Sequence, residues 1–84
     1  MSNVRDIVIR ALHNASGFLS DPEMARLALS GEDLALDRLE LDSLSRFEVM
    51  MEIEERLSIE VDDDEIDGLT TLDALVAFVE SRAP

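Results

Sequence analysis

Apolar residues near the N-terminus of this 84-residue chain recur at the spacing of an amphipathic helix. They occupy positions i, i+3, i+4, i+7 and i+8, so they fall on one face when each residue turns the helix by about 100°. The pattern predicts a helix that starts after Ser2 or Asn3, ends near Ala15 and is stopped by Gly17. Its predicted buried stripe consists of Val4, Ile7, Val8, Ala11 and Leu12.

A second stripe of this kind lies near the C-terminal end. Thr70 and Asp73 have the spacing of a capping box, which is typical of a helix start. The helix predicted after them would bury Leu72, Leu75, Val76 and Val79. Arg82 would lie close to its negative end and would complement the helix dipole.

The central helix, predicted over residues 42–57, differs from these two because it has two apolar faces. One stripe falls within an arc of roughly 100°, the width of an ordinary core face; it consists of Val49, Met50, Ile53 and Leu57. Leu44, Phe47 and Met51 lie on the opposite side. A helix in a small domain needs one apolar face, so the second stripe indicates a surface that other proteins bind. The alternative is that another segment of the chain buries it.

Acidic residues border this second stripe, with Glu48 and Glu55 on one side and Glu54 on the other. At the start of the same helix, Asp42 is a good N-cap because its carboxylate can accept hydrogen bonds from the first turn. Ser43 follows in that turn, where an attached anion would meet unpaired backbone N–H groups.

A further short helix is predicted between the first and central ones. Ser20 and Glu23 read as a capping box with Pro22 in the first turn, so a helix through about Leu29 is expected, with Gly31 beyond its end. Four leucines then recur through a polar segment: Leu34, Leu36, Leu39 and Leu41. They indicate a segment held against the core rather than a free linker, and we expect one domain, residues 1–84.

After the central helix, Ile59 and Val61 are expected to contact the core from a loop. The acidic residues 62–65 would cap a short helix that contains Ile66 and is closed by Gly68.

The same region offers a candidate calcium site. Asp63, Glu65, Asp67 and Gly68 match positions 1, 3, 5 and 6 of an EF-hand loop. Position 12, which normally supplies a bidentate glutamate, is Ala74. Because that ligand is missing, the sequence predicts no metal-binding residues.

Charge narrows the choice of partners. The chain has twenty acidic residues and seven basic ones, all arginine, which gives a net charge of −13. Residues 1–42 carry −4 and residues 43–84 carry −9. This excess argues against nucleic acid and anionic membranes and favours basic partner surfaces. No segment reaches the ~20 apolar residues of a membrane span and no signal peptide is visible, so we expect a cytoplasmic protein.

The residue types present do not predict an enzyme. There is no cysteine, which excludes disulfides, thiolate metal sites and cysteine nucleophiles together. His13 is the single histidine and lies off the predicted core stripe, so we interpret it as a surface residue. Ser43 has no G-x-S-x-G elbow and no evident base, which argues against a self-activated nucleophile.

Several stretches of the chain resemble the signature region of acyl carrier proteins. They are LELDSL at 39–44, FEVM at 47–50 and EIEE at 52–55. Downstream, IEVD at 59–62 and LTTLDAL at 69–75 continue the match at the family's spacing. The resemblance covers about the last fifty residues, and the first helix agrees in pattern only.

The resemblance implies an all-α fold, a small four-helix bundle whose long first loop has room for an extra short helix. It also implies that Ser43 carries a 4′-phosphopantetheine arm, a covalent cofactor taken from coenzyme A, with Asp42 as the N-cap. The arm would hold acyl or aminoacyl groups as thioesters and present them to partner enzymes, while the carrier itself performs no catalysis. The implied partner-binding residues are Leu44, Phe47, Glu48, Met51, Glu54 and Glu55.

The implied partners are a phosphopantetheinyl transferase, an acyl- or aminoacyl-loading ligase, and acyl-processing enzymes with basic surfaces, as in fatty acid or polyketide biosynthesis. The carrier is expected to be a monomer. Two departures indicate a specialised, stand-alone member: the first connection is several residues longer than usual, and Glu40 stands where glycine is usual. Two other functions stay open. One is an unmodified interaction module that uses the Leu44, Phe47 and Met51 stripe, and the other is a degenerate EF-hand-like calcium-binding protein.

Overall fold

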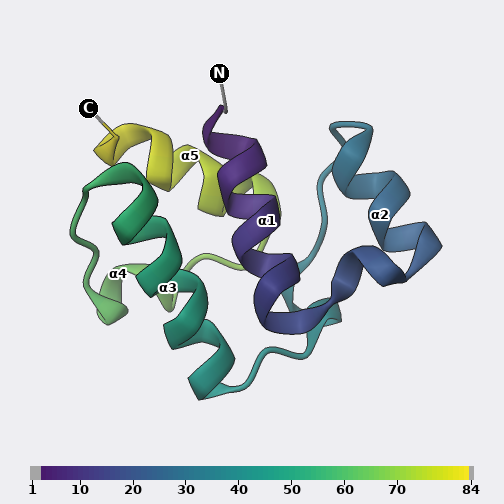
Figure 1. The fold of residues 1–84 in the computed structure, drawn as a ribbon, viewed down its shortest axis with the longest axis horizontal. Helices are drawn as coiled ribbons and strands as arrows, with labels where there is room; N and C mark the ends of the chain where they lie inside the picture. Colours follow the sequence, from purple (N-terminus) through teal and green to yellow (C-terminus); the bar gives the residue numbers. More distant parts are fainter. Residues whose placement is uncertain (1–2, 84) are drawn as a thin grey trace.

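Helix boundaries in this protein follow capping residues that are visible in the sequence. The computed structural model describes residues 3–83, without the side chain of Asp63, and over that range the chain consists of helices and the segments that connect them (Figure 1). In chain order the elements are α1 (Val4–Ser16), η1 (Phe18–Ser20), α2 (Pro22–Leu29), η2 (Leu36–Leu39), α3 (Ser43–Leu57), α4 (Asp63–Ile66) and α5 (Leu72–Arg82). The predicted all-α class, with an extra short helix in the first connection, is confirmed.

Both caps of α1 are as predicted. The Asn3 side chain accepts a hydrogen bond from the Asp6 amide at 2.8 Å. Gly17 ends the helix with a φ of 71°, a left-handed conformation that glycine adopts without steric cost. One residue of the predicted stripe is wrong: Ile9 is buried instead of Ile7. Because η1, α3 and α5 all contact α1, its covered arc is wide and extends to Ile9.

His13 is half-buried, which corrects its interpretation as a surface residue. Its Nδ1 accepts a hydrogen bond from the Leu19 amide at 3.2 Å, and its ring meets the Phe18 ring edge-on, with centroids 6.3 Å apart. The histidine therefore fixes the turn that follows α1.

Helix α2 starts one residue later in the capping pattern than expected. The N-cap is Asp21, whose side chain accepts hydrogen bonds from the Glu23 and Met24 amides at 3.0 and 3.2 Å, whereas Ser20 ends η1. Aspartate and serine are equally good caps, so the local sequence could not distinguish them. Pro22 lies in the first turn and Leu29 ends the helix, as predicted, and the shifted cap makes Pro22 the first helical residue.

The connection after α2 pairs with the start of α5. Ala35 and Thr71 form an isolated antiparallel bridge, which places the backbone of the connection beside residues 70–72. This pairing shifts the α5 cap, because the backbone carbonyl of Thr70 accepts a hydrogen bond from the Leu36 amide. The Thr71 hydroxyl accepts a hydrogen bond from the Ala74 amide at 3.1 Å. Thr71, not Thr70, is the N-cap.

Arg5 and Asp33 fasten the same connection to the two terminal helices. The Arg5 guanidinium donates to Asp73 Oδ1 at 2.9 Å and to the carbonyls of Ala28 and Glu32. Asp33 Oδ1 accepts from the Asp73 amide at 2.9 Å. The amide of Asp73 holds the pKa of the Asp33 carboxyl below its usual value, with smaller contributions from other neighbours.

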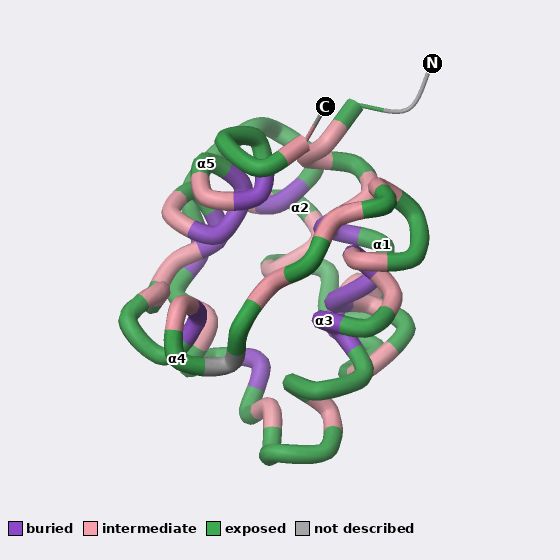
Figure 2. Tube along the Cα trace, turned by 90° about the vertical axis from the view of Figure 1, so that its left-hand side faces the viewer, coloured by how far each residue is buried: buried purple, intermediate pink, exposed green. Residues whose placement is uncertain are grey.

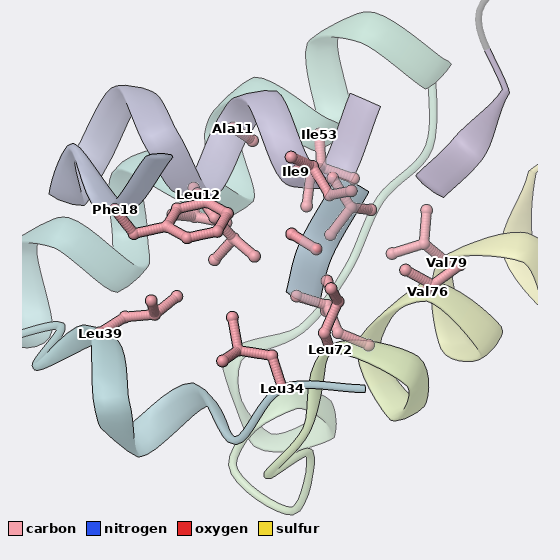
Figure 3. Packing of buried hydrophobic residues seen from close by; sticks show 14 residues of the cluster. Ile9, Ala11, Leu12, Phe18, Leu34, Leu39, Ile53, Leu72, Val76 and Val79 are labelled. Carbon is pink, nitrogen blue, oxygen red and sulfur yellow. The ribbon is translucent and has the colours of Figure 1, made fainter. Parts of the chain in front are cut away.

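The core forms where α1, α3, α5 and the long connection meet (Figure 3). In Figure 2 the buried positions appear as short segments on each of these helices, separated by exposed ones. Fully buried side chains of large volume are Val8, Leu12, Ile53, Leu72 and Val79. The leucines of the connection are also used as predicted: Leu34 and Leu39 are buried, and Leu36 and Leu41 pack against the core.

The segment after α3 is short and partly held by side chains. Ile66 in α4 is buried and Ile59 packs against the core, as expected. Helix α4 ends at Ile66, two residues before Gly68, whose φ is not positive. Glu65 in α4 pairs with Arg82, whose guanidinium also lies 5.0 Å from the centroid of the Phe78 ring. No helix in the described part of the chain is long and apolar enough to cross a membrane.

Candidate functional site

Asp42 is the N-cap of α3, as the sequence predicts. Its backbone is extended, with φ −81° and ψ 178°, and its carboxylate accepts a hydrogen bond from the Ser45 amide at 2.7 Å. That amide lowers the pKa of the Asp42 carboxyl, and the Ser45 hydroxyl adds to the effect. The cap therefore stays ionised under ordinary conditions and fixes where the helix starts.

Ser43 is the first residue of α3 and its side chain is exposed. The helix start lies at the end of the molecule opposite to the two chain termini (Figure 1). A hydroxyl held at this position is accessible to another enzyme while its backbone remains fixed by the Asp42 cap.

A groove of about 230 Å³ opens directly beside Ser43. It is lined by Ser43, Arg46, Phe47, Met50, Ile66 and Asp67. Three of these side chains are apolar, and the other three supply one hydroxyl, one guanidinium and one carboxylate. The groove can therefore contact a chain that carries both polar and apolar groups.

The second apolar stripe of α3 is exposed, as predicted. Leu44, Phe47 and Met51 keep 66%, 53% and 44% of their surface accessible. On the opposite face, Val49, Met50 and Ile53 are at most 6% accessible, and Leu57 packs against the core. No segment of the described chain covers the Leu44, Phe47 and Met51 stripe enough to bury it, so the alternative of a core stripe is wrong.

The three acids predicted to border this stripe are not equivalent. Glu48 and Glu55 are exposed. Glu54 is half-buried, and its carboxylate accepts a hydrogen bond from the Val61 amide at 2.9 Å. This bond ties the following loop to α3, a structural task that its place in the sequence did not reveal.

Glu40, which stands where acyl carrier proteins usually have glycine, has a left-handed backbone with φ 52° and ψ 43°. That conformation is strained for a residue with a Cβ atom and is free of strain for glycine. Glu40 therefore adds backbone strain to this turn that a glycine at the same position would not.

Two residues of the EF-hand-like pattern have other partners, whereas the side chain of Asp63 lies outside the described residues. Glu65 pairs with Arg82, and the Asp67 carboxylate lies 3.9 Å from the Arg46 guanidinium. Among the side chains that the structure describes, no three histidine, aspartate or glutamate residues gather closely enough to hold a metal ion.

Four residues that line the groove were absent from the predicted site: Arg46, Met50, Ile66 and Asp67. Arg46 follows Ser43 by three positions, a spacing that places two side chains on the same face of a helix. That signal was available in the sequence. Ile66 reaches the groove from α4, a long-range contact that no local pattern indicates.

Comparison with known proteins agrees with this geometry. Residues 23–79 match the family described as "Phosphopantetheine attachment site". The chain belongs to the acyl carrier protein family, which bears this attachment site. A curated relative, the "Acyl carrier protein" of Streptococcus thermophilus, is 40% identical over 50 residues.

That similarity covers 60% of this chain and 65% of the relative, so the chain spans a little under two thirds of the curated relative's length. A comparison with solved structures found no significant match.

Proposed function

We propose that this chain acts as an acyl carrier whose Ser43 receives a 4′-phosphopantetheine arm from coenzyme A. The observation that carries the proposal is the position of Ser43, exposed at the first position of α3 behind the Asp42 cap and inside the matched residues 23–79. The terminal thiol of the arm would hold acyl or aminoacyl groups as thioesters.

Attachment requires a separate phosphopantetheinyl transferase. Ser43 Oγ would attack the pantetheine-bearing phosphorus of coenzyme A and form a new O–P bond. The P–O bond to adenosine 3′,5′-bisphosphate breaks, and the hydroxyl proton passes to a base on the transferase. An exposed Ser43 hydroxyl without a base of its own fits a reaction in which the transferase supplies the base.

The chain's own residues fit such an arm. Asp42 fixes the start of the helix, and the groove beside Ser43 offers Phe47, Met50 and Ile66 to the less polar part of the arm. The carrier would supply a flexible tether and a high effective concentration of cargo rather than any chemical step.

The exposed stripe on α3 is the proposed docking surface for partner enzymes. Leu44, Phe47 and Met51 supply apolar area, and Glu48 and Glu55 supply negative charge around it. Glu54 would contribute through its charge while it remains bonded to the loop. Partners with basic, apolar-grooved surfaces are the best complement: the transferase, a loading ligase and acyl-processing enzymes.

The test is modification in vitro with coenzyme A and a broad-specificity phosphopantetheinyl transferase, followed by intact-protein mass spectrometry. We expect the mass of one phosphopantetheine to be added to the wild type and to Ser45→Ala, and no addition to Ser43→Ala. Ser45 is a matched control because it lies in the same first turn of α3.

A second function, an unmodified interaction module, is favoured by the exposure of the α3 stripe alone. An unchanged mass after incubation would support that module over the carrier. An increase that survives Ser43→Ala would refute Ser43 as the attachment residue.

A further inference from the structure

Two hollows meet beside Ser43. Next to the groove at Ser43 lies a second, partly open hollow of about 240 Å³, whose lining includes the core residues Leu12 and Leu75. The groove and the second hollow share part of their walls: Arg46, Met50, Ile66 and Asp67 line both. Arg46 and Asp67 therefore stand at the boundary between two partly open hollows.

Arg46 is the one basic residue among the described residues that line the two hollows. The acidic ones are Asp37, Glu40 and Asp67. Its contact with Asp67 is long, at 3.9 Å, and the side chains are 47% and 74% accessible. An exposed ion pair of this kind contributes little to stability, so Arg46 can leave Asp67 at small cost.

A phosphodiester on Ser43 would offer Arg46 a better partner. Residues three apart on a helix have Cβ atoms about 5–6 Å apart, within reach of an arginine side chain. A guanidinium can bind phosphate oxygens through two parallel N–H···O bonds, which an ion pair at the distance seen here does not provide.

We infer that Arg46 is a positioning residue for the arm: it exchanges Asp67 for the phosphodiester on Ser43 and directs the arm along the groove. The inference rests on the proposed function, because it requires the modification of Ser43. With the phosphate held, the arm runs over Phe47 and Met50 toward Ile66, and its thiol spends part of its time sheltered there. The Asp67 carboxylate then no longer has Arg46 as its ion-pair partner.

The experiment compares four variants with the wild type, each first converted to the phosphopantetheine form and verified by intact mass. Arg46→Gln removes the guanidinium, and Arg46→Lys keeps the charge without the planar fork. Arg56→Gln is the matched control, since Arg56 lies on the same helix, is 49% accessible and pairs with Glu52. Asp67→Asn removes the partner that competes with the phosphate.

The first readout is the rate at which a neutral reagent, iodoacetamide, alkylates the thiol at low salt. We expect Arg46→Gln to react about twofold to fivefold faster than the wild type, the size expected for one partly exposed ion pair. Arg56→Gln should match the wild type, Arg46→Lys should fall between, and Asp67→Asn should react no faster than the wild type. High salt should shrink the difference, because screening weakens exposed charge pairs.

The second readout is the NMR signal of the Arg46 Nε–H group, which should shift when the arm is attached, while the Arg56 signal stays in place. If Arg46→Gln is fully modified but reacts at the wild-type rate and the Arg46 signal does not move, the inference is overturned and the proposed function stands. If the wild type itself gains no phosphopantetheine, the proposed function fails and the inference fails with it.

Discussion

Replacing Phe47 by alanine should affect partner binding far more than folding. Phe47 keeps 53% of its surface accessible, so less than half of the side chain leaves water on folding. A fully buried Phe→Ala change costs about 3–5 kcal/mol, part of it from the cavity left behind. At an open site solvent fills the space, so we expect a loss of about 1 kcal/mol, which for a domain of this size lowers Tm by about 4–8 °C.

The opposite face of α3 provides the comparison. Ile53 has no accessible surface, and Ile53→Ala should cost about 2–5 kcal/mol. A closer match is the neighbouring pair Met50 and Met51, which share a residue type but are 6% and 44% accessible. Met50→Ala should therefore destabilise the fold clearly more than Met51→Ala.

Urea denaturation followed by circular dichroism measures these differences in one series. The rate of modification by the transferase, measured on each folded variant, reports binding. Phe47→Ala and Met51→Ala should slow modification while most of the stability remains. The reasoning fails if Phe47→Ala loses as much unfolding free energy as Ile53→Ala, or if the folded variant is modified at the wild-type rate.

Three further predictions concern charge and backbone conformation. Glu48→Lys and Glu55→Lys should mainly slow association with the transferase and reduce the salt dependence of the association rate, because charges at the edge of an interface act through steering. Stopped-flow kinetics at two salt concentrations would measure the association rate, and an unchanged rate would contradict this prediction. Glu40→Gly should stabilise the fold by about 0.5–1 kcal/mol, since it relieves a left-handed residue at a cost in unfolded-chain entropy, whereas Glu40→Ala should not; equal effects of the two would contradict the argument. The pKa values of the Asp33 and Asp42 carboxyls are lowered in the folded state. The stability that these two carboxylates contribute is therefore complete above about pH 4 and is lost as the pH falls through the lowered values. When the free energy of unfolding is measured against pH, it should fall less steeply in this acidic range for Asp33→Asn than for the wild type.

The parts of this fold that could be predicted from the sequence are those that local chemistry determines. The Asp42 cap, the two faces of α3 and the stop at Gly17 depend on residues within one or two helical turns. Each was predicted correctly because a cap or a stripe needs only its own helix.

The errors occur where distant segments decide between local alternatives. Thr70 and Thr71 are equally able to cap α5, and the choice falls to Thr71 because the Thr70 carbonyl accepts from Leu36. From the sequence Glu54 is predicted to be a surface acid, but the loop after α3 places the Val61 amide within hydrogen-bond distance of its carboxylate. Such contacts bring together residues that no spacing rule connects.

The same reason accounts for the incomplete site. Ser43 and the stripe beside it lie on one helix and were found together. The groove needs α4 as its second wall, and the position of α4 depends on a loop whose path only the folded structure defines.

The acids around the α3 stripe also bear on how copies of this protein behave toward one another. Three large apolar side chains exposed on one helix would ordinarily promote self-association. Any second copy that approached with the same face would bring its own Glu48 and Glu55 against the first pair, and the whole molecule carries a charge of −13. A basic enzyme meets no such repulsion. We therefore expect the negative border to oppose self-association through this apolar stripe and to leave the stripe accessible to a basic partner.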